Sequence, residues 1–156
     1  LSALKAAAIE AARAKFGASI KLGNGKIVPI ENAFDLDLLR TPFRTDALKK
    51  GYPEGTVYIN ARSDQKPGAV FSYAGPDGKP ANVPPDQIAD VFYPGAKVKA
   101  SVTAYGYDTE GNKGVTFAIN NIQFIENGER LDNRVAAENE FVADLSQKPA
   151  DLDAIV

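Results

Sequence analysis

The chain has 156 residues and an apolar content of 44%, which suits one domain with one hydrophobic core. It contains no Cys and no His, so disulfides, thiolate zinc sites and catalytic dyads or triads built on either residue are excluded. The net charge is −2, and no apolar run approaches the roughly 20 residues that span a bilayer. The chain also lacks Met, and Leu1 is a poor residue to follow a removed initiator, so we expect a trimmed core of a longer product.

Charge is distributed unevenly along the chain. Residues 1–80 carry 12 basic and 8 acidic side chains, a net charge of +4, whereas residues 121–156 carry 3 and 8, a net charge of −5. A basic body with an acidic end is typical of proteins whose tail competes with nucleic acid for a basic groove. The alternative is that the acidic end only keeps the protein in solution.

The first element in chain order is a helix predicted over about residues 3–16, capped by Ser2 and closed by Gly17. An Asn-Gly pair, which favours positive φ, predicts a turn over residues 21–26. From residue 27 to 44 we expect irregular structure with one or two short strands.

Alternation predicts a strand over residues 56–62. Its two faces would hold Val57, Ile59 and Ala61 on one side and Tyr58, Asn60 and Arg62 on the other. A second short strand is expected over residues 68–73, followed by dense turn chemistry at residues 75–80. Pro85 starts a short predicted helix through Val91.

The strand predicted over residues 97–107 alternates strictly between two kinds of side chain. The face predicted to meet the core is Val98, Ala100, Val102, Ala104 and Gly106. The opposite face is Lys97, Lys99, Ser101, Thr103, Tyr105 and Tyr107. Amines attract phosphates and flat rings stack on bases, so this face suits single-stranded nucleic acid. However, most half-buried strands have a polar face that only contacts water.

Residues 108–114 are predicted to form a hairpin loop, and residues 115–124 the returning strand. Its apolar set changes phase at Asn120 and Asn121, which indicates a β-bulge. The order of elements predicts a mainly β fold: a five-stranded barrel of the oligonucleotide/oligosaccharide-binding (OB) type, with an N-terminal helix and a short helix between strands 3 and 4. Other small all-β barrels fit the same order.

We expect residues 1–145 to form this single domain and residues 146–156 to be an acidic, mobile C-terminal segment. Such a segment would compete with nucleic acid for a basic groove or dock partner proteins.

Several segments resemble one known family. They are Tyr58-Ile59-Asn60-Ala61-Arg62-Ser63, Lys66-Pro67-Gly68, Phe92-Tyr93-Pro94-Gly95, Ala104-Tyr105-Gly106-Tyr107, Gly111-Asn112-Lys113-Gly114-Val115 and Asn120-Asn121-Ile122-Gln123. The set resembles the phage-encoded single-stranded-DNA-binding proteins first catalogued as a domain of unknown function. The resemblance implies an OB fold, sequence-tolerant binding of single-stranded DNA and a role in phage replication or recombination. It also implies a place in the cytoplasm of the infected bacterial host, and phage replication proteins as partners of the acidic C-terminal segment. The chain departs from the family at Thr45-Asp46, where the family has an Asp-Gly turn.

The candidate DNA-binding residues are aromatic or basic. Tyr105 and Tyr107 would stack on bases, and Tyr58 and Arg62 would extend the platform. Phosphates would be neutralised by Lys66, Lys97, Lys99 and Lys113. The alternative roles are sheet packing for the tyrosines and a solvated surface for the lysines. No catalytic residue, cofactor or metal ligand is expected.

Rival functions remain open from the residues. A protein-interaction or structural module of a phage replisome or particle could use the same barrel without DNA. A carbohydrate-binding barrel would show aromatic residues without the lysines, and an enzyme lacks both a P-loop and the usual catalysts of neutral pH. The residues leave open whether the protein is a monomer or a homodimer, and no membrane partner is expected.

Overall fold

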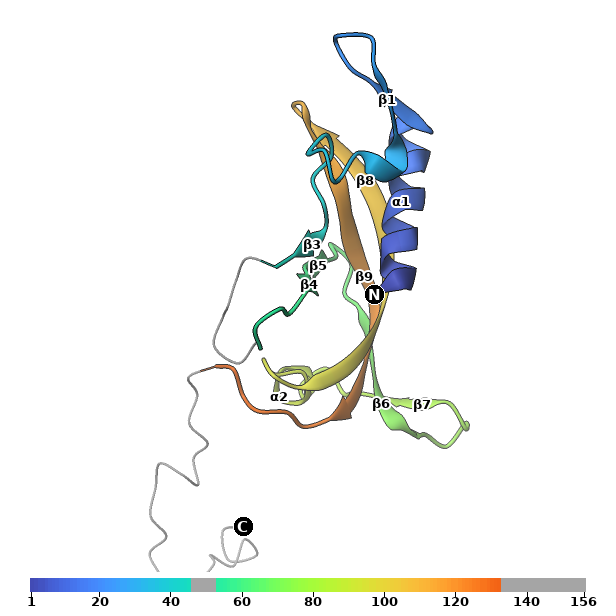
Figure 1. Cartoon of the computed structure of the whole chain (residues 1–156). Helices are drawn as coiled ribbons and strands as arrows, with labels where there is room; N and C mark the ends of the chain where they lie inside the picture. Colours follow the sequence, from blue (N-terminus) through green and yellow to red (C-terminus); the bar gives the residue numbers. More distant parts are fainter. Residues whose placement is uncertain (46–52, 133–156) are drawn as a thin grey trace, which may run out of the picture.

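The computed structural model describes residues 1–45 and 53–132, and this part is mainly β with an N-terminal helix (Figure 1). The elements are α1 (Ser2–Phe16), β1 (Ser19–Lys21), β2 (Ile27–Pro29), the 3₁₀ helix η1 (Ile30–Asn32), β3 (Phe43–Arg44), β4 (Tyr58–Ile59), β5 (Ala61–Arg62), β6 (Gly68–Ala74), β7 (Pro80–Asn82), α2 (Ile88–Val91), β8 (Lys97–Thr109) and β9 (Asn112–Glu126). The predicted acidic segment 146–156 and the domain boundary before it lie outside the described residues.

The long hairpin of β8 and β9 organises the fold. Its turn has two central residues, Glu110 with φ 52° and Gly111 with φ 82°. Positive φ at both positions matches the right-handed twist of the flanking strands. The observed turn is shorter than the loop predicted over residues 108–114, because the two strands pair up to Thr109 and Asn112.

At the level of Asn120, the pairing of β9 is interrupted on both edges of the strand. Toward β8, Ser101 pairs with Asn121 and Val102 with Ile119, so Asn120 is the extra residue of a β-bulge. This confirms the predicted change of phase. On the other edge, β5 and β6 both run parallel to β9, and residues 63–67 loop out between them.

The core lies between α1, η1 and the upper part of the hairpin. Its buried members are Ala8, Ala12, Ile30, Ala33, Leu39, Val115 and Phe117. α1 packs directly on β8 at Gly106, where an added Cβ would lie 2.6 Å from the Lys15 Cβ. The predicted core face is therefore correct at Val102, Ala104 and Gly106, but it is wrong at Val98 and Ala100, which are exposed.

The N-terminal helix is confirmed, but its predicted cap is wrong. Ser2 lies inside the helix, and no side chain caps its start. Gly17, with φ 88°, ends the helix, and its N–H donates to the Arg13 carbonyl. The predicted turn over residues 21–26 joins β1 and β2 as an antiparallel hairpin.

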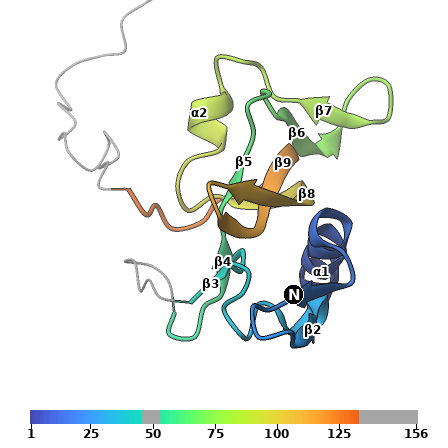
Figure 2. The ribbon, with the colours of Figure 1, turned by 90° about the horizontal axis from the view of Figure 1, so that it is seen from above.

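The strand predicted over residues 56–62 is divided at Asn60, because the chain changes partner there. β4 pairs antiparallel with β3, whereas β5 pairs parallel with β9. The described strands form two two-stranded sheets and one five-stranded sheet, and none of them closes, so the five-stranded barrel is not confirmed. Viewed from above (Figure 2), α1 and β2 lie on one side of β8 and β9, and α2, β6 and β7 on the other.

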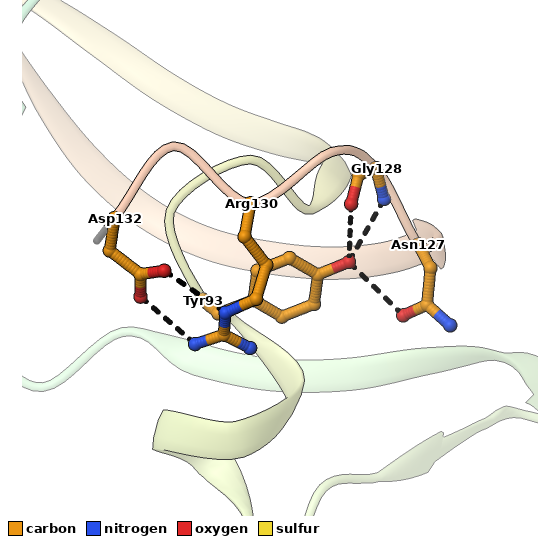
Figure 3. A network of polar contacts seen from close by, with 5 residues as sticks. All are labelled: Tyr93, Asn127, Gly128, Arg130 and Asp132. Carbon is orange, nitrogen blue, oxygen red and sulfur yellow. Dashed lines mark hydrogen bonds and ion pairs between the residues drawn. The ribbon is translucent and has the colours of Figure 1, made fainter. Parts of the chain in front are cut away.

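The lower end of the hairpin is held by a strap, residues 127–132 (Figure 3). The Tyr93 hydroxyl accepts a hydrogen bond from the Gly128 N–H and donates to the Gly128 carbonyl, both at 2.9 Å. The Arg130 guanidinium lies 4.5 Å from the centre of the Tyr93 ring and forms an ion pair with Asp132 at 2.9 Å. Phe92 packs edge-on against Phe124, so Phe92 and Tyr93 both serve the structure of this end.

Candidate nucleic-acid interface

One face of the hairpin points away from α1, and we call it the outer face. Tyr105 pairs with Thr116 and Tyr107 with Gly114, and directly opposed residues share a face. The outer face consists of Lys99, Ser101, Thr103, Tyr105 and Tyr107 of β8 and Gly114, Thr116, Ala118, Asn121 and Gln123 of β9. Arg62 pairs with Ala118 and extends this face onto β5.

At the upper end of the outer face is a hollow of about 350 Å³, which we call the arginine hollow. Its lining includes Arg40, Arg44, Asn60, Arg62, Tyr107 and Thr116. Arg40 reaches the hairpin through backbone bonds, because its N–H donates to Lys113 and its carbonyl accepts from Val115. Residues from three separate segments therefore converge beside one tyrosine.

The described residues that line the arginine hollow include three guanidinium groups and no carboxylate. Within residues 1–45 and 53–132, no carboxylate forms an ion pair with Arg40, Arg44 or Arg62. Asp37 lines the neighbouring hollow, which shares Arg40 and Arg44. A guanidinium presents a planar fork of donors that matches two oxygens of a phosphate. The hollow therefore has the chemistry of an anion site.

Gly114 allows the close approach that builds this site. A Cβ at Gly114 would lie 2.7 Å from the Tyr107 hydroxyl and 2.8 Å from the Arg40 Cβ. Tyr107 thus lies across Gly114 as a half-buried wall of the hollow. Tyr105 differs, because 47% of its surface is exposed and its ring is accessible for stacking.

Below Tyr105 the outer face is lined by amides and hydroxyls. Asn120 donates to the Thr103 hydroxyl at 2.9 Å and Asn121 to the Ser101 hydroxyl at 3.4 Å, so both amides serve the bulge. A second hollow of about 350 Å³, the lower groove, follows at the end of the face. Its lining includes Val70, Lys99, Ser101, Asn121 and Gln123.

The structure brings five of the eight predicted site residues onto the outer face, which Lys97 continues two positions before Lys99. They are Arg62, Lys97, Lys99, Tyr105 and Tyr107. Lys66 is exposed in the loop between β5 and β6, beside the bulge. Tyr58 is half-buried in β4, where it pairs with Arg44, and it does not line the arginine hollow.

Two predicted lysines form ion pairs. Lys113 pairs with Asp108 and directly precedes Gly114, the partner of Tyr107. Alternation therefore turns the Lys113 side chain to the face opposite to Tyr107. Its Nζ lies 3.5 Å from Asp108. Lys97 forms an ion pair with Glu126 at 2.6 Å, and this hydrogen bond raises the pKa of Lys97 and lowers the pKa of Glu126.

Sequence reasoning missed Arg40 and Arg44 as site residues. Neither arginine is among the candidate DNA-binding residues that the sequence offers. Arg40 forms a parallel bridge with Gly114. No local periodicity signals such a long-range contact. The one local signal is that two arginines flank Thr41-Pro42-Phe43, which hints at a basic segment.

The comparisons with known proteins agree with this chemistry. The family described as "Enterobacter phage Enc34, ssDNA-binding protein" matches residues 1–153. The chain belongs to this family of phage single-stranded-DNA-binding proteins, which confirms the resemblance. Protein p50 of Acyrthosiphon pisum secondary endosymbiont phage 1 is 30% identical over 132 residues, which cover 81% of this chain. The chain spans 64% of the length of p50. Among the described residues, no helix is long and apolar enough to cross a membrane.

Proposed function

We propose that the protein binds single-stranded DNA along the outer face without sequence preference. In this role it would protect or organise single strands during phage replication or recombination, in the cytoplasm of the infected host. The observation that carries the proposal is the arginine hollow beside the exposed ring of Tyr105. The family to which the chain belongs supports it.

Each part of the outer face has a task in this proposal. Arg40, Arg44 and Arg62 hold the phosphate backbone, while Tyr105 stacks on a base. An aromatic ring stacks on any of the four bases, so binding tolerates sequence. A duplex keeps its bases paired and stacked inside, so it cannot offer one to Tyr105. Lys66 and Lys99 add positive charge along the same path, and Tyr58 pairs with Arg44 across β3 and β4.

We further propose that the sheet is an opened form of the five-stranded OB barrel and that the protein acts without catalysis. The change of partner at Asn60 supports this, because one strand shared between two sheets is how a small barrel turns its corners. The short helix α2, directly before β8, has the place of the helix before the fourth barrel strand.

The test is a fluorescence-polarisation titration of the full chain with labelled single-stranded and duplex oligonucleotides over a range of salt concentrations. If about four phosphates are neutralised, the plot of log K against log salt has a slope of about −3, at −0.7 per phosphate. The double variant R40A/R62A should reduce this slope, whereas Lys113→Ala, on the opposite face, should leave it nearly unchanged. Affinity independent of salt, or equal affinity for duplex, would overturn the proposal.

A further inference from the structure

The β6–β7 hairpin carries a pair of stacked rings that the arginine hollow does not use. The rings of Phe71 and Tyr73 lie 4.8 Å apart with their planes 17° from parallel. Tyr73 is 60% exposed, so the far side of its ring faces solvent. The β6–β7 pairing shifts register between Val70 and Ala74, which is an irregularity of the kind that redirects side chains.

The aromatic platform, Phe71 and Tyr73, comes directly after Val70 in β6. Val70 lines the lower groove, and the Gln123 amide, also in its lining, donates to the Phe71 backbone carbonyl at 3.3 Å. In Figure 1 the β6–β7 hairpin projects beside the lower end of β9, whereas β3 and β5, which contribute to the arginine hollow, lie farther up. From Thr116, opposite Tyr105, to Gln123 the path along β9 is about 23 Å at about 3.3 Å per residue.

The surroundings of the platform favour a nucleic acid over a protein partner. Lys99 lines the groove that leads to it, and Lys79 lies in the turn of the same hairpin. Within the described part of the chain, neither lysine forms an ion pair. A flat exposed ring together with unpaired amines is the combination that holds a base and its neighbouring phosphates.

We propose that Tyr73, supported from behind by Phe71, is a second base-stacking site. A single strand held at the arginine hollow then runs across Tyr105, along the lower groove and onto the β6–β7 hairpin. This inference rests on the proposed function and deepens it, because it specifies the path of the DNA and a minimum length for full affinity.

The experiment compares Tyr73→Ala and Tyr73→Phe with the unchanged chain on thymidine oligomers of about 4 and about 16 nucleotides, the range of site sizes for such domains. Tyr73→Ala should weaken binding of the long oligomer about fivefold or more, because the smallest stacking contribution of one ring corresponds to about that factor. It should leave binding of the short oligomer unchanged. Tyr73→Phe should retain the affinity. The matched control is Tyr105→Ala, which should weaken both oligomers.

Several outcomes separate the two proposals. If the unchanged chain binds neither oligomer, the proposed function fails. If it binds and Tyr73→Ala has no effect, or weakens both oligomers equally, the second stacking site alone is wrong. A change in oligomeric state of Tyr73→Ala by light scattering, without any dependence on oligomer length, would make the platform a contact between protein chains and overturn the inference. Because Tyr73 is exposed, an unchanged melting curve is expected for each variant.

Discussion

Tyr105 and Phe117 lie on opposite faces of the same hairpin, and their substitution should have opposite effects. Tyr105→Ala should weaken DNA binding by about 1–3 kcal/mol, the contribution of one stacked base, with little loss of stability. Phe117 is 1% exposed and meets Phe43 edge-on, so Phe117→Ala should lower the free energy of unfolding by about 3–5 kcal/mol. Urea unfolding and polarisation measure the two effects. Equal destabilisation by both changes would contradict the assignment of faces.

The Lys97–Glu126 ion pair withholds one positive charge from the DNA. Glu126→Gln should free the Lys97 ammonium and make the salt dependence steeper by about 0.7, the amount for one phosphate on a single strand. Asp108→Asn is the matched control, because it frees Lys113 on the opposite face with the same change of net charge. If both variants change the slope alike, net charge and not position controls binding.

At the scale of elements, α1 depends on the absence of a side chain at Gly106. A Cβ there would lie 2.6 Å from the Lys15 Cβ and 3.3 Å from the Ala11 carbonyl oxygen. Gly106→Val should therefore force α1 off β8 and cost about 1–3 kcal/mol of stability. Thermal unfolding tests this, with Gly23→Ala as control, because no atom lies within 4 Å of a Cβ at Gly23. Equal melting temperatures of the two variants would show that α1 does not pack on β8 in this way.

The elements that the sequence predicted are those defined by local patterns. Alternation located the strand at residues 97–107, and its change of phase located the bulge at Asn120. The acidic and glycine residues after Tyr107 signalled a hairpin, but they did not determine how far the two strands pair beyond it. Periodicity and turn chemistry depend on neighbouring residues, so they are visible without the fold.

What the sequence could not predict depends on partners distant in the chain. The break at Asn60 follows from pairing with β3 on one side and β9 on the other. The convergence of Arg40 with Tyr107 follows from a single bridge to Gly114. Lys113 was assigned to a loop, and only the observed register places it on the face opposite to Tyr107.

At the scale of the whole molecule, the acidic end remains a prediction, because residues 146–156 lie outside the described part. The net charge of residues 138–156 is −4, opposite in sign to the arginine hollow. A tethered anionic segment is present at high effective concentration, so deletion of residues 146–156 should tighten DNA binding at low salt. The gain should shrink as salt rises, because charge attraction is screened. Oligonucleotide affinity of full and shortened chains at two ionic strengths measures this. Unchanged affinity at low salt would leave this segment as a docking or solubility element.

The double interruption of β9 has a mechanical consequence. At the level of Asn120 the strand lacks regular pairing toward β8 and also toward the gap between β5 and β6. The upper part, which carries α1 and the arginine hollow, and the lower part, which carries the aromatic platform, are therefore joined at a natural hinge. Backbone amides at residues 119–121 should exchange with deuterium faster than those on either side. A DNA strand that bridges the hinge should slow this exchange, because the bound strand would hold the two parts of the sheet in a fixed relative position.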